Sequence, residues 1–237
     1  MEPGEYTKMS QAEDRMWWYR AIHARLLDAL TGHPGPVLDA GCGTGGFLAL
    51  LRRARPSVEI FGLEWHAQGA ALAAEKAGCP IARGSINALP FAKGVFGAVI
   101  ATDVLCHAAV DPVAALAEVR RVLRPGGRLI INMPAFMALM SAHDTAVHNT
   151  RRQTARETRA MLEQAGFRVV RVGYWNGLLL PLMVLRRKVF TAPPGRSDVA
   201  TFPPWLDGMF HAMTELERRL PFALPAGGSV LAIAERP

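Results

Sequence analysis

The chain of 237 residues contains no apolar run of about 20 residues, the length that a membrane-spanning helix needs. Its N-terminus, MEPGEYTK, also lacks the apolar core of a signal peptide. We therefore expect a soluble cytoplasmic protein. Half of the residues are hydrophobic, which is enough to bury the core of one α/β domain of this length.

Cysteine is scarce, and the residues present are not spaced like metal ligands. Cys42, Cys79 and Cys106 form no CxxC pair, and an odd number cannot all pair within one chain. We expect reduced thiols and no metal site built on cysteine.

Acidic residues are fewer than basic ones, at 20 against 27, which leaves a formal net charge of +7. Such an excess can attract nucleic acid or anionic substrates. The basic residues are mostly dispersed arginines, however, and no RNA-binding motif accompanies them. We expect no nucleic-acid partner.

Glycine, by contrast, is concentrated in the stretch VLDAGCGTGGFLALL, residues 37–51. An apolar start, a glycine-rich centre and a helix-like apolar repeat predict a strand, a tight turn and a helix. Glycines allow positive φ and let a ligand lie against bare backbone, and the first turn of the helix offers unpaired N–H groups. The stretch therefore predicts a site for a nucleotide-like ligand.

Asp39 helps to choose between two ligand classes. The spacing Gly41-x-Gly43-x-x-Gly46 fits a dinucleotide turn, in which a pyrophosphate sits on the helix N-terminus. A carboxylate two residues before the first glycine would repel phosphates, but it can pair with a cationic amino acid such as the methionine part of S-adenosylmethionine. DAGCGTGG closely resembles the first motif of the class I S-adenosylmethionine-dependent methyltransferases. The resemblance implies cofactor contacts by Asp39, Gly41, Cys42, Gly43 and Gly45.

A second stretch carries the same resemblance. In residues 111–127, Asp111 suits an N-cap and Pro112 the first helical position, and LAEVRRVLRPGGRLII is very like the small-molecule members of the family. The implied fold is α/β and Rossmann-like: a seven-stranded, mostly parallel sheet in the order 3-2-1-4-5-7-6, with the last strand antiparallel and helices on both faces. We expect a single domain over residues 1–237, with a helical cap at about 1–33 and a lid-like insertion at about 177–226.

The resemblance also implies the rest of the cofactor site. Glu64 ends the second predicted strand and would bind the ribose hydroxyls, with Trp65 flanking the adenine. Where the family usually has an acidic residue for the adenine, this chain has Ser85 and Ile86, which leaves adenine recognition to Ser85, Asn87 or backbone groups. Thr102 ends the fourth predicted strand, beside the expected position of the methyl group.

Residues that could bind the acceptor come from three segments. Trp18 lies on a predicted helix over residues 11–30, where aromatic core packing is an equal alternative. His107 follows the fourth strand, and a solvent-exposed position is its alternative. Arg151 and Arg152 follow the fifth strand and could hold a carboxylate or phosphate.

His143 and His148 lie in the same segment after the fifth strand. A histidine near its ordinary pKa can accept the proton of an acceptor hydroxyl, so either one is a candidate base. His143, Asp144 and His148 could instead bind a metal, but their spacing is not diagnostic, and we expect none. A purely structural role for the histidines is the third alternative.

The sequence thus predicts methyl transfer from S-adenosylmethionine, with S-adenosylhomocysteine as product, to a small molecule. A hydroxyl of a natural product or other secondary metabolite is the favoured acceptor, with an apolar or an anionic body, and a homodimer remains open. An NAD-dependent oxidoreductase and a non-catalytic S-adenosylmethionine-binding protein are the alternatives, and a nucleic-acid methyltransferase is a weaker one.

Overall fold

The computed structural model describes residues 6, 10–33, 35–189 and 202–237, without the side chains of residues 143 and 186–189. A sheet with the strand order β3-β2-β1-β4-β5-β7-β6 runs through the molecule. Its strands are β1 (Val37–Ala40), β2 (Ile60–Glu64), β3 (Ile81–Arg83), β4 (Phe96–Thr102), β5 (Leu123–Pro134), β6 (Arg168–Trp175) and β7 (Ser229–Glu235). All pairings are parallel except those of β7 with β5 and β6, which confirms the predicted topology.

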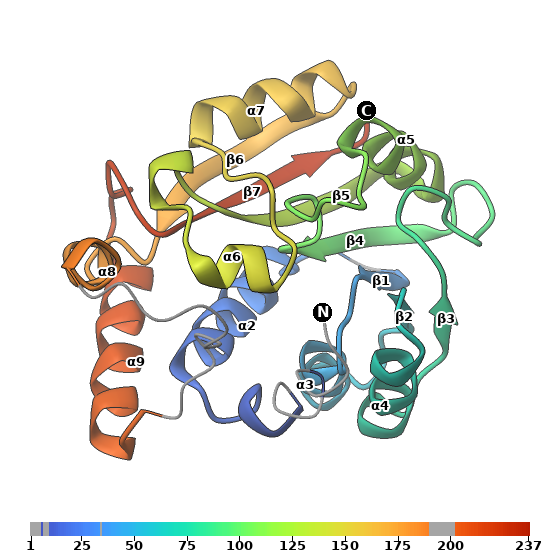
Figure 1. Cartoon of the computed structure of the whole chain (residues 1–237). Coiled ribbons are helices and arrows are strands. Elements are labelled where there is room, and N and C mark those ends of the chain that lie inside the picture. The colour runs from blue at the N-terminus through green and yellow to red at the C-terminus, as the bar shows by residue number, and fades with distance from the viewer. Residues whose placement is uncertain (1–5, 7–9, 34, 190–201) are drawn as a thin grey trace.

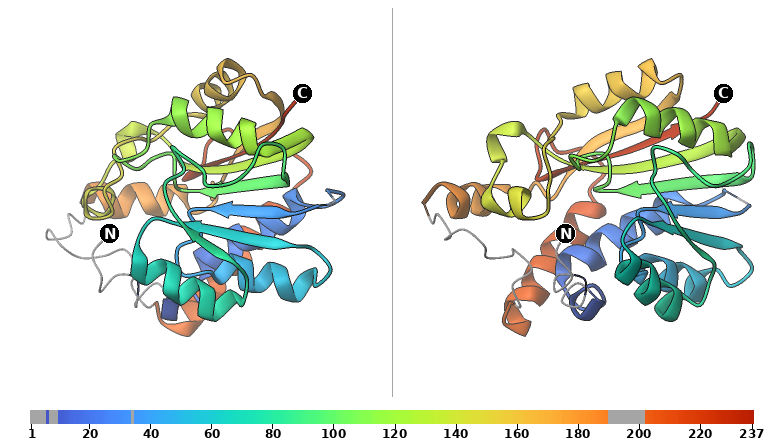
Figure 2. Two further views of the ribbon diagram at one scale, coloured as in Figure 1. Left: turned by 90° about the vertical axis from the view of Figure 1, so that its right-hand side faces the viewer. Right: turned by 45° about the vertical axis from the view of Figure 1, so that its right-hand side comes forward.

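Helices cover both faces of this sheet (Figures 1 and 2). They are α2 (Trp17–Ala29), α3 (Gly46–Ala54), α4 (Ala67–Ala77), α5 (Pro112–Val122), α6 (Ala142–Ala146), α7 (Ala155–Gln164), α8 (Leu180–Val189) and α9 (Pro204–Arg218). Figure 1 shows α5 and α7 on one face and α2, α3 and α4 on the other. Each face has its own hydrophobic core, because a parallel sheet is apolar on both sides. Among the described residues, no helix is long and apolar enough to span a bilayer.

The helix ends follow from local sequence signals. The Asp111 side chain accepts a hydrogen bond from the Val113 amide, which caps α5 ahead of Pro112. Thr154 and Glu157 form the reciprocal capping box of α7. Gly78 ends α4 in the left-handed conformation, with φ of 59°, where a Cβ would be strained.

The predicted helix over residues 11–30 is wrong at its N-terminal end. Residues 13–15 form a turn, and α2 begins at Trp17. The Trp17 amide donates to Asp207 Oδ1 of α9 at 2.8 Å, so a contact distant in sequence satisfies the first turn of the helix. The turn buries Glu13, whose carboxylate pairs with Lys76 of α4.

The segment between β6 and β7 packs beside α2. The ring centroids of Trp17 and Phe210 of α9 lie 5.7 Å apart in an edge-on arrangement. The buried Glu217 carboxylate accepts hydrogen bonds from the backbone amides of Asn176, Gly177 and Leu178, at 2.6, 2.8 and 3.2 Å. These bonds fix the C-terminal half of α9 to the end of β6. The helices α8 and α9 form one wall of the cavity described next.

Candidate active site

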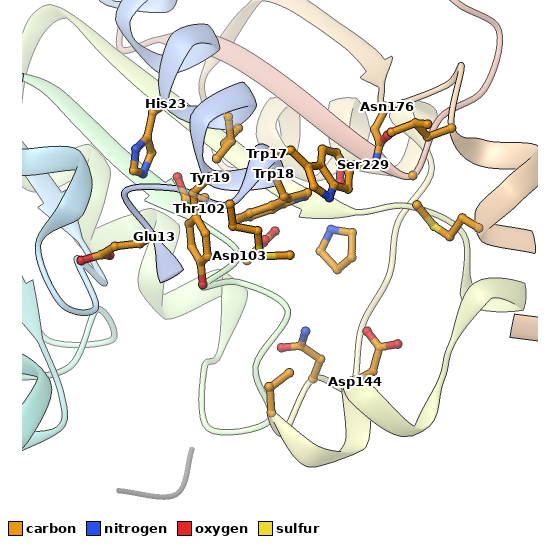
Figure 3. Close-up of a pocket in the computed structure, with 18 of the residues that line it drawn as sticks. Glu13, Trp17, Trp18, Tyr19, His23, Thr102, Asp103, Asp144, Asn176 and Ser229 are labelled. Atoms are coloured by element: carbon orange, nitrogen blue, oxygen red, sulfur yellow. The ribbon is translucent and has the colours of Figure 1, made fainter. Parts of the chain in front are cut away.

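A cavity of about 1060 Å³ opens at the carboxyl ends of β1 and β4. In an open α/β sheet the strand order reverses between such neighbours, and ligands bind in the resulting crevice. Figure 3 shows side chains from α2, among them Trp17 and Trp18, along one side of the cavity and Asp144 of α6 on the opposite side. Residues of α8 and α9 complete the lining.

The glycine turn enters this cavity as the sequence predicts. Gly41 and Gly43 line it, with φ of 102° and 56°. A Cβ at Gly41 would collide with the Val104 side chain. Gly45 is the N-cap of α3 with φ of 86°, and a Cβ there would approach the Ala73 Cα to 2.8 Å. Only glycine meets both the conformational and the spatial requirement at these positions.

Asp39 also lines the cavity, although only 4% of its surface is exposed. Burial raises its pKa to about 7, and the nearby Glu64 and Glu13 carboxylates add to the shift. A buried carboxylate in this setting is stabilised by any cation that enters. The charge environment at the end of β1 therefore suits an ammonium or sulfonium group, not a diphosphate.

Glu64 is held by three donors. Its carboxylate accepts hydrogen bonds from the amides of Gly43 and His66, at 3.0 and 2.9 Å, and from the Tyr6 hydroxyl at 3.2 Å. The Tyr6 ring stacks on His66, with centroids 4.7 Å apart. Glu64 and Trp65 lie outside the cavity lining, and Trp65 is 71% exposed. Tyr6 could not be predicted as a partner of Glu64, because the two residues lie 58 positions apart in the chain.

The structure brings neither predicted adenine residue to the cavity. Ile86 is 4% exposed and packs in the hydrophobic core with Leu63 and Leu89, as an apolar side chain should. The Ser85 hydroxyl accepts a hydrogen bond from the Asn87 amide at 3.2 Å and stabilises the local turn. Asn87, the other candidate, donates its side-chain amide to the Ala109 carbonyl at 3.1 Å.

Thr102 lines the cavity, and its buried hydroxyl has no hydrogen-bond partner among the described residues. The next residue, Asp103, also lines the cavity and has φ of 53°, an uncommon conformation for a residue other than glycine. Burial raises its pKa to about 7, although a hydrogen bond from Asn132 opposes the shift. Asp103 is not among the predicted site residues, although its place at the end of a buried strand was an available signal.

Two predicted acceptor residues lie at the cavity. Trp18 lines it from α2, with its ring centroid 6.1 Å from that of Trp175. His107 lines it from the segment after β4, where burial lowers the pKa of the imidazole. His107 is therefore neutral at neutral pH, with one ring nitrogen that donates a hydrogen bond and one that accepts a hydrogen bond.

The two arginines are occupied by protein groups. Arg152 Nη2 lies 2.8 and 2.9 Å from the two carboxylate oxygens of Asp144, and its Nη1 donates to the Ala135 carbonyl at 3.0 Å. Arg151 lies outside the cavity lining and donates to the His107 carbonyl at 2.6 Å. Both guanidinium groups hold the segment after β5 in place, so the expectation that they bind an anionic acceptor has no support in the geometry.

His148, one of the two candidate bases, is exposed and outside the cavity lining. It adopts φ of 59°, and its carbonyl accepts a hydrogen bond from the Ala108 amide at 2.9 Å. The side chain of His143, the other candidate, lies outside the described residues. The Asp144 carboxylate is engaged by Arg152 and by Ser141, and no cluster of three metal-ligating side chains occurs in the described part of the chain.

Glu13 is a cavity residue that sequence reasoning missed. It is 4% exposed, and burial raises its pKa although Lys76 opposes the shift. Its carboxylate lies at the N-terminus of α3, because a Cβ at Gly46 would meet the carboxyl carbon at 2.6 Å. A carboxylate is favourable at the positive end of a helix dipole.

Comparison with known proteins agrees with this geometry. Residues 38–131 match the family model described as a methyltransferase domain. A probable S-adenosylmethionine-dependent methyltransferase of Mycolicibacterium smegmatis is 31% identical over 171 residues, which cover 70% of this chain and 65% of that protein. The chain contains a class I S-adenosylmethionine-dependent methyltransferase domain. The family's cofactor is S-adenosylmethionine, and the NAD-dependent oxidoreductase is thereby set aside.

Two further proteins, one similar in sequence and one similar in structure, are named for their substrates. The demethylmenaquinone methyltransferase of Deinococcus radiodurans is 38% identical over 119 residues, or 48% of each chain. The geranyl diphosphate C-methyltransferase of Streptomyces coelicolor, solved with geranyl diphosphate and S-adenosylhomocysteine, superimposes with a TM-score of 0.65 at 19% identity, covering 92% of this chain and 78% of that one. The chain thus spans about half to two thirds of the length of these curated relatives.

Proposed function

We propose that this methyltransferase moves the methyl group of S-adenosylmethionine to a hydroxyl oxygen of a small, neutral and largely apolar molecule. The observation that carries the proposal is that one cavity has a polar side and an apolar side. At the end of β1, the buried Asp39 carboxylate faces bare glycine backbone, whereas the far side of the cavity is apolar. A polar half for a cationic donor and an apolar half for an acceptor suit a two-ligand reaction.

The apolar half of the cavity is formed by three helices and the segments beside them. Its lining residues from α2, α8 and α9 and the segments beside them are Met16, Trp17, Trp18, Ile22, Leu26, Leu179, Leu182, Met183, Leu185, Phe202, Leu206 and Phe210. Single-ligand sites occupy roughly 300–1,000 Å³. The cavity volume of about 1060 Å³ lies at the top of this range, which supports room for the reactive part of the cofactor and an acceptor together.

The charges at the cavity favour a neutral acceptor. Four carboxylates line it, on Glu13, Asp39, Asp103 and Asp144. The lining guanidinium, Arg152, is already paired with Asp144. A carboxylate or phosphate on the acceptor would therefore find no unpaired cation among the described lining residues, and it would lose its own hydration.

In the reaction, the cofactor supplies a methyl group on an activated sulfonium. The residues of the chain supply position and a dry environment: the glycine backbone and Asp39 hold the donor side, and α2, α8 and α9 exclude water from the acceptor side. Alignment of donor and acceptor accounts for much of the rate enhancement in such a displacement.

Calorimetric titration with S-adenosylhomocysteine and with NADH tests the first half of the proposal. We expect heat only with S-adenosylhomocysteine. The second half is tested with methyl-labelled S-adenosylmethionine and paired acceptors: 4-alkylphenols against 4-alkylbenzoates of equal chain length. Labelled methyl ethers from the phenols alone are expected. A protein that binds S-adenosylhomocysteine but labels no acceptor would be the non-catalytic alternative.

A carbon acceptor is a second candidate, because the structural neighbour is described as a C-methyltransferase. The same assay separates the two outcomes. Mass-spectrometric fragmentation of the labelled product shows whether the methyl group sits on oxygen or on the ring. If the ring is methylated, the assignments of the cofactor and of the acceptor cavity stand, but the methyl group goes to carbon instead of oxygen.

A further inference from the structure

Asp103 occupies a defined position between the end of β4 and the acceptor half of the cavity. Its backbone amide donates to the Asn132 carbonyl at 3.0 Å, and its Oδ1 accepts from Asn132 Nδ2 at 2.9 Å. The Cys106 thiol donates to the Asp103 carbonyl at 3.1 Å. These contacts hold the residue in its left-handed conformation, which costs about 1–2 kcal/mol for a residue other than glycine. Strain that is maintained by several contacts is typical of functional positions.

The partner of Asp103 is itself fixed. Asn132 of β5 is fully buried, and its Oδ1 accepts from the indole N–H of Trp175 at 2.8 Å. Since Trp175 can only donate, the Asn132 amide must direct its NH₂ group at Asp103. The Arg25 guanidinium covers the Trp175 ring, 4.7 Å from its centroid. The carboxylate is therefore oriented by a chain of buried groups that reaches α2.

Among the described residues, nothing occupies the second carboxylate oxygen of Asp103. The described residues give Asp103 Oδ2 no donor, and no lysine or arginine forms an ion pair with the carboxylate in the described part of the chain. Asp103 lines the cavity beside Thr102 (Figure 3). A cavity-facing carboxylate with one oriented oxygen and one open oxygen can accept a proton from a bound molecule.

We propose that Asp103 is the base that takes the proton of the acceptor hydroxyl. The inference rests on the proposed function. As the acceptor oxygen forms its bond to the methyl carbon, the sulfur–carbon bond breaks and its electron pair stays on the sulfur of S-adenosylhomocysteine. The hydroxyl proton passes to Asp103 Oδ2. Asn132 is the positioning residue, because it sets the direction of the carboxylate without contacting the acceptor.

The histidine alternatives fit this role less well. His148 is exposed and lies outside the cavity lining. His107 lines the cavity, but among the described residues it has no counterpart of the buried Asn132–Trp175 chain that orients the Asp103 carboxylate. Asp103 combines a lining position, a fixed orientation and an open oxygen.

The test uses Asp103→Asn, which keeps the shape and suits the positive φ, because asparagine tolerates this region. The acceptors are a 4-alkylphenol and its 2,6-difluoro analogue, which has nearly the same shape but is largely ionised at slightly alkaline pH. For the protonated phenol, kcat should fall by about 10²–10⁴-fold, the usual contribution of a general base. For the ionised analogue the loss should be far smaller. Calorimetry with S-adenosylhomocysteine reports whether the variant is folded.

Asp111→Asn is the matched control, since Asp111 only caps α5 at the surface and asparagine caps equally well. It should leave both rates unchanged. Equal losses for both phenols in Asp103→Asn, or none, would overturn the base assignment and leave the proposed function intact. If the wild-type protein binds S-adenosylhomocysteine but methylates neither phenol nor any other hydroxyl probe, the proposed function fails, and this inference with it.

If Asp103→Asn does not bind S-adenosylhomocysteine, Asn132→Asp provides the second variant. It retains a side chain of the same shape but removes the donor to Asp103. A role as base predicts that the pH profile for the protonated phenol shifts to higher pH, because a second carboxylate raises the pKa of the first. An unchanged profile would contradict the proposal.

Discussion

Arg152 and Asp144 form a buried ion pair at the wall of the cavity, in which both carboxylate oxygens accept from Arg152 Nη2 at 2.8 and 2.9 Å. Their side chains are 4% and 1% exposed. The pair joins α6 to the segment that follows it, and the Arg152 contact with the Ala135 carbonyl extends the link to the end of β5.

Removal of one partner should be costly. Asp144→Asn leaves a buried guanidinium without a counter-charge, so we expect the free energy of unfolding to fall by about 3–5 kcal/mol in urea denaturation. Arg159→Gln breaks an exposed pair with Glu163 and is the control, with an expected change under about 0.5 kcal/mol.

Burial raises the pKa of Asp144, but Arg152 and Ser141 outweigh it and hold the pKa below its usual value. Ionised Asp144 therefore adds to the free energy of unfolding above its unfolded pKa, and this stabilisation is lost as the pH falls through its lower, folded pKa.

Asp39 should make the ligand-free protein less stable as the pH rises. Its folded pKa of about 7 exceeds the unfolded value near 4, so the folded state binds more protons between these pH values. Stability from this group therefore falls from about pH 4 to about pH 7. We expect Asp39→Asn to flatten this part of the pH profile and to raise the free energy of unfolding at neutral pH by up to about 4 kcal/mol.

The same Asp39→Asn change should weaken cofactor binding. Loss of the carboxylate removes a charge-assisted contact worth about 1.5–3 kcal/mol, which corresponds to an increase of roughly 10- to 150-fold in the dissociation constant of S-adenosylmethionine. Calorimetry on the folded variant measures it. A variant that binds S-adenosylmethionine as tightly as the wild type does would remove Asp39 from the cofactor site.

Gly41→Ala tests the turn itself. A Cβ at this position would meet the Val104 side chain, and φ of 102° is strained for alanine. We expect binding of S-adenosylhomocysteine to be lost or weakened at least tenfold, with a lower melting temperature. Gly173→Ala in β6 is the control, because a Cβ there meets nothing within 4 Å and should be neutral or slightly stabilising. Equal behaviour of the two variants would contradict the assignment.

Tyr6→Phe addresses the contact at Glu64. Ribose hydroxyls that bind this carboxylate would compete with the Tyr6 hydroxyl, which is bonded to it at 3.2 Å. Removal of one such hydrogen bond, worth about 0.5–1.5 kcal/mol, should tighten S-adenosylhomocysteine binding by about 2- to 12-fold. Glu64→Gln in the same titration should weaken binding. A weaker complex with Tyr6→Phe would show that Tyr6 supports the cofactor instead of competing with it.

The sequence by itself determined the framework of this protein. The glycine turn and the N-cap at Asp111 could be predicted because they depend on neighbouring residues, whose backbone conformations and periodicity are local properties. The strand order followed from the family resemblance. The family resemblance rested on the same local motifs. It also placed Asp39 and Thr102 at the ends of their strands, where the cavity lies.

The tertiary structure decided which polar groups are free to act. Asp103 is oriented by Asn132, 29 positions away, and Asn132 by Trp175, 43 positions further along. From the sequence, Arg152 was predicted to bind the acceptor, but in the fold it is paired with Asp144. Glu13 lies in the turn before α2, and the fold buries it at the cavity beside Lys76. Whether a charged side chain is paired or open depends on burial and on partners distant in sequence, and only the folded chain sets these.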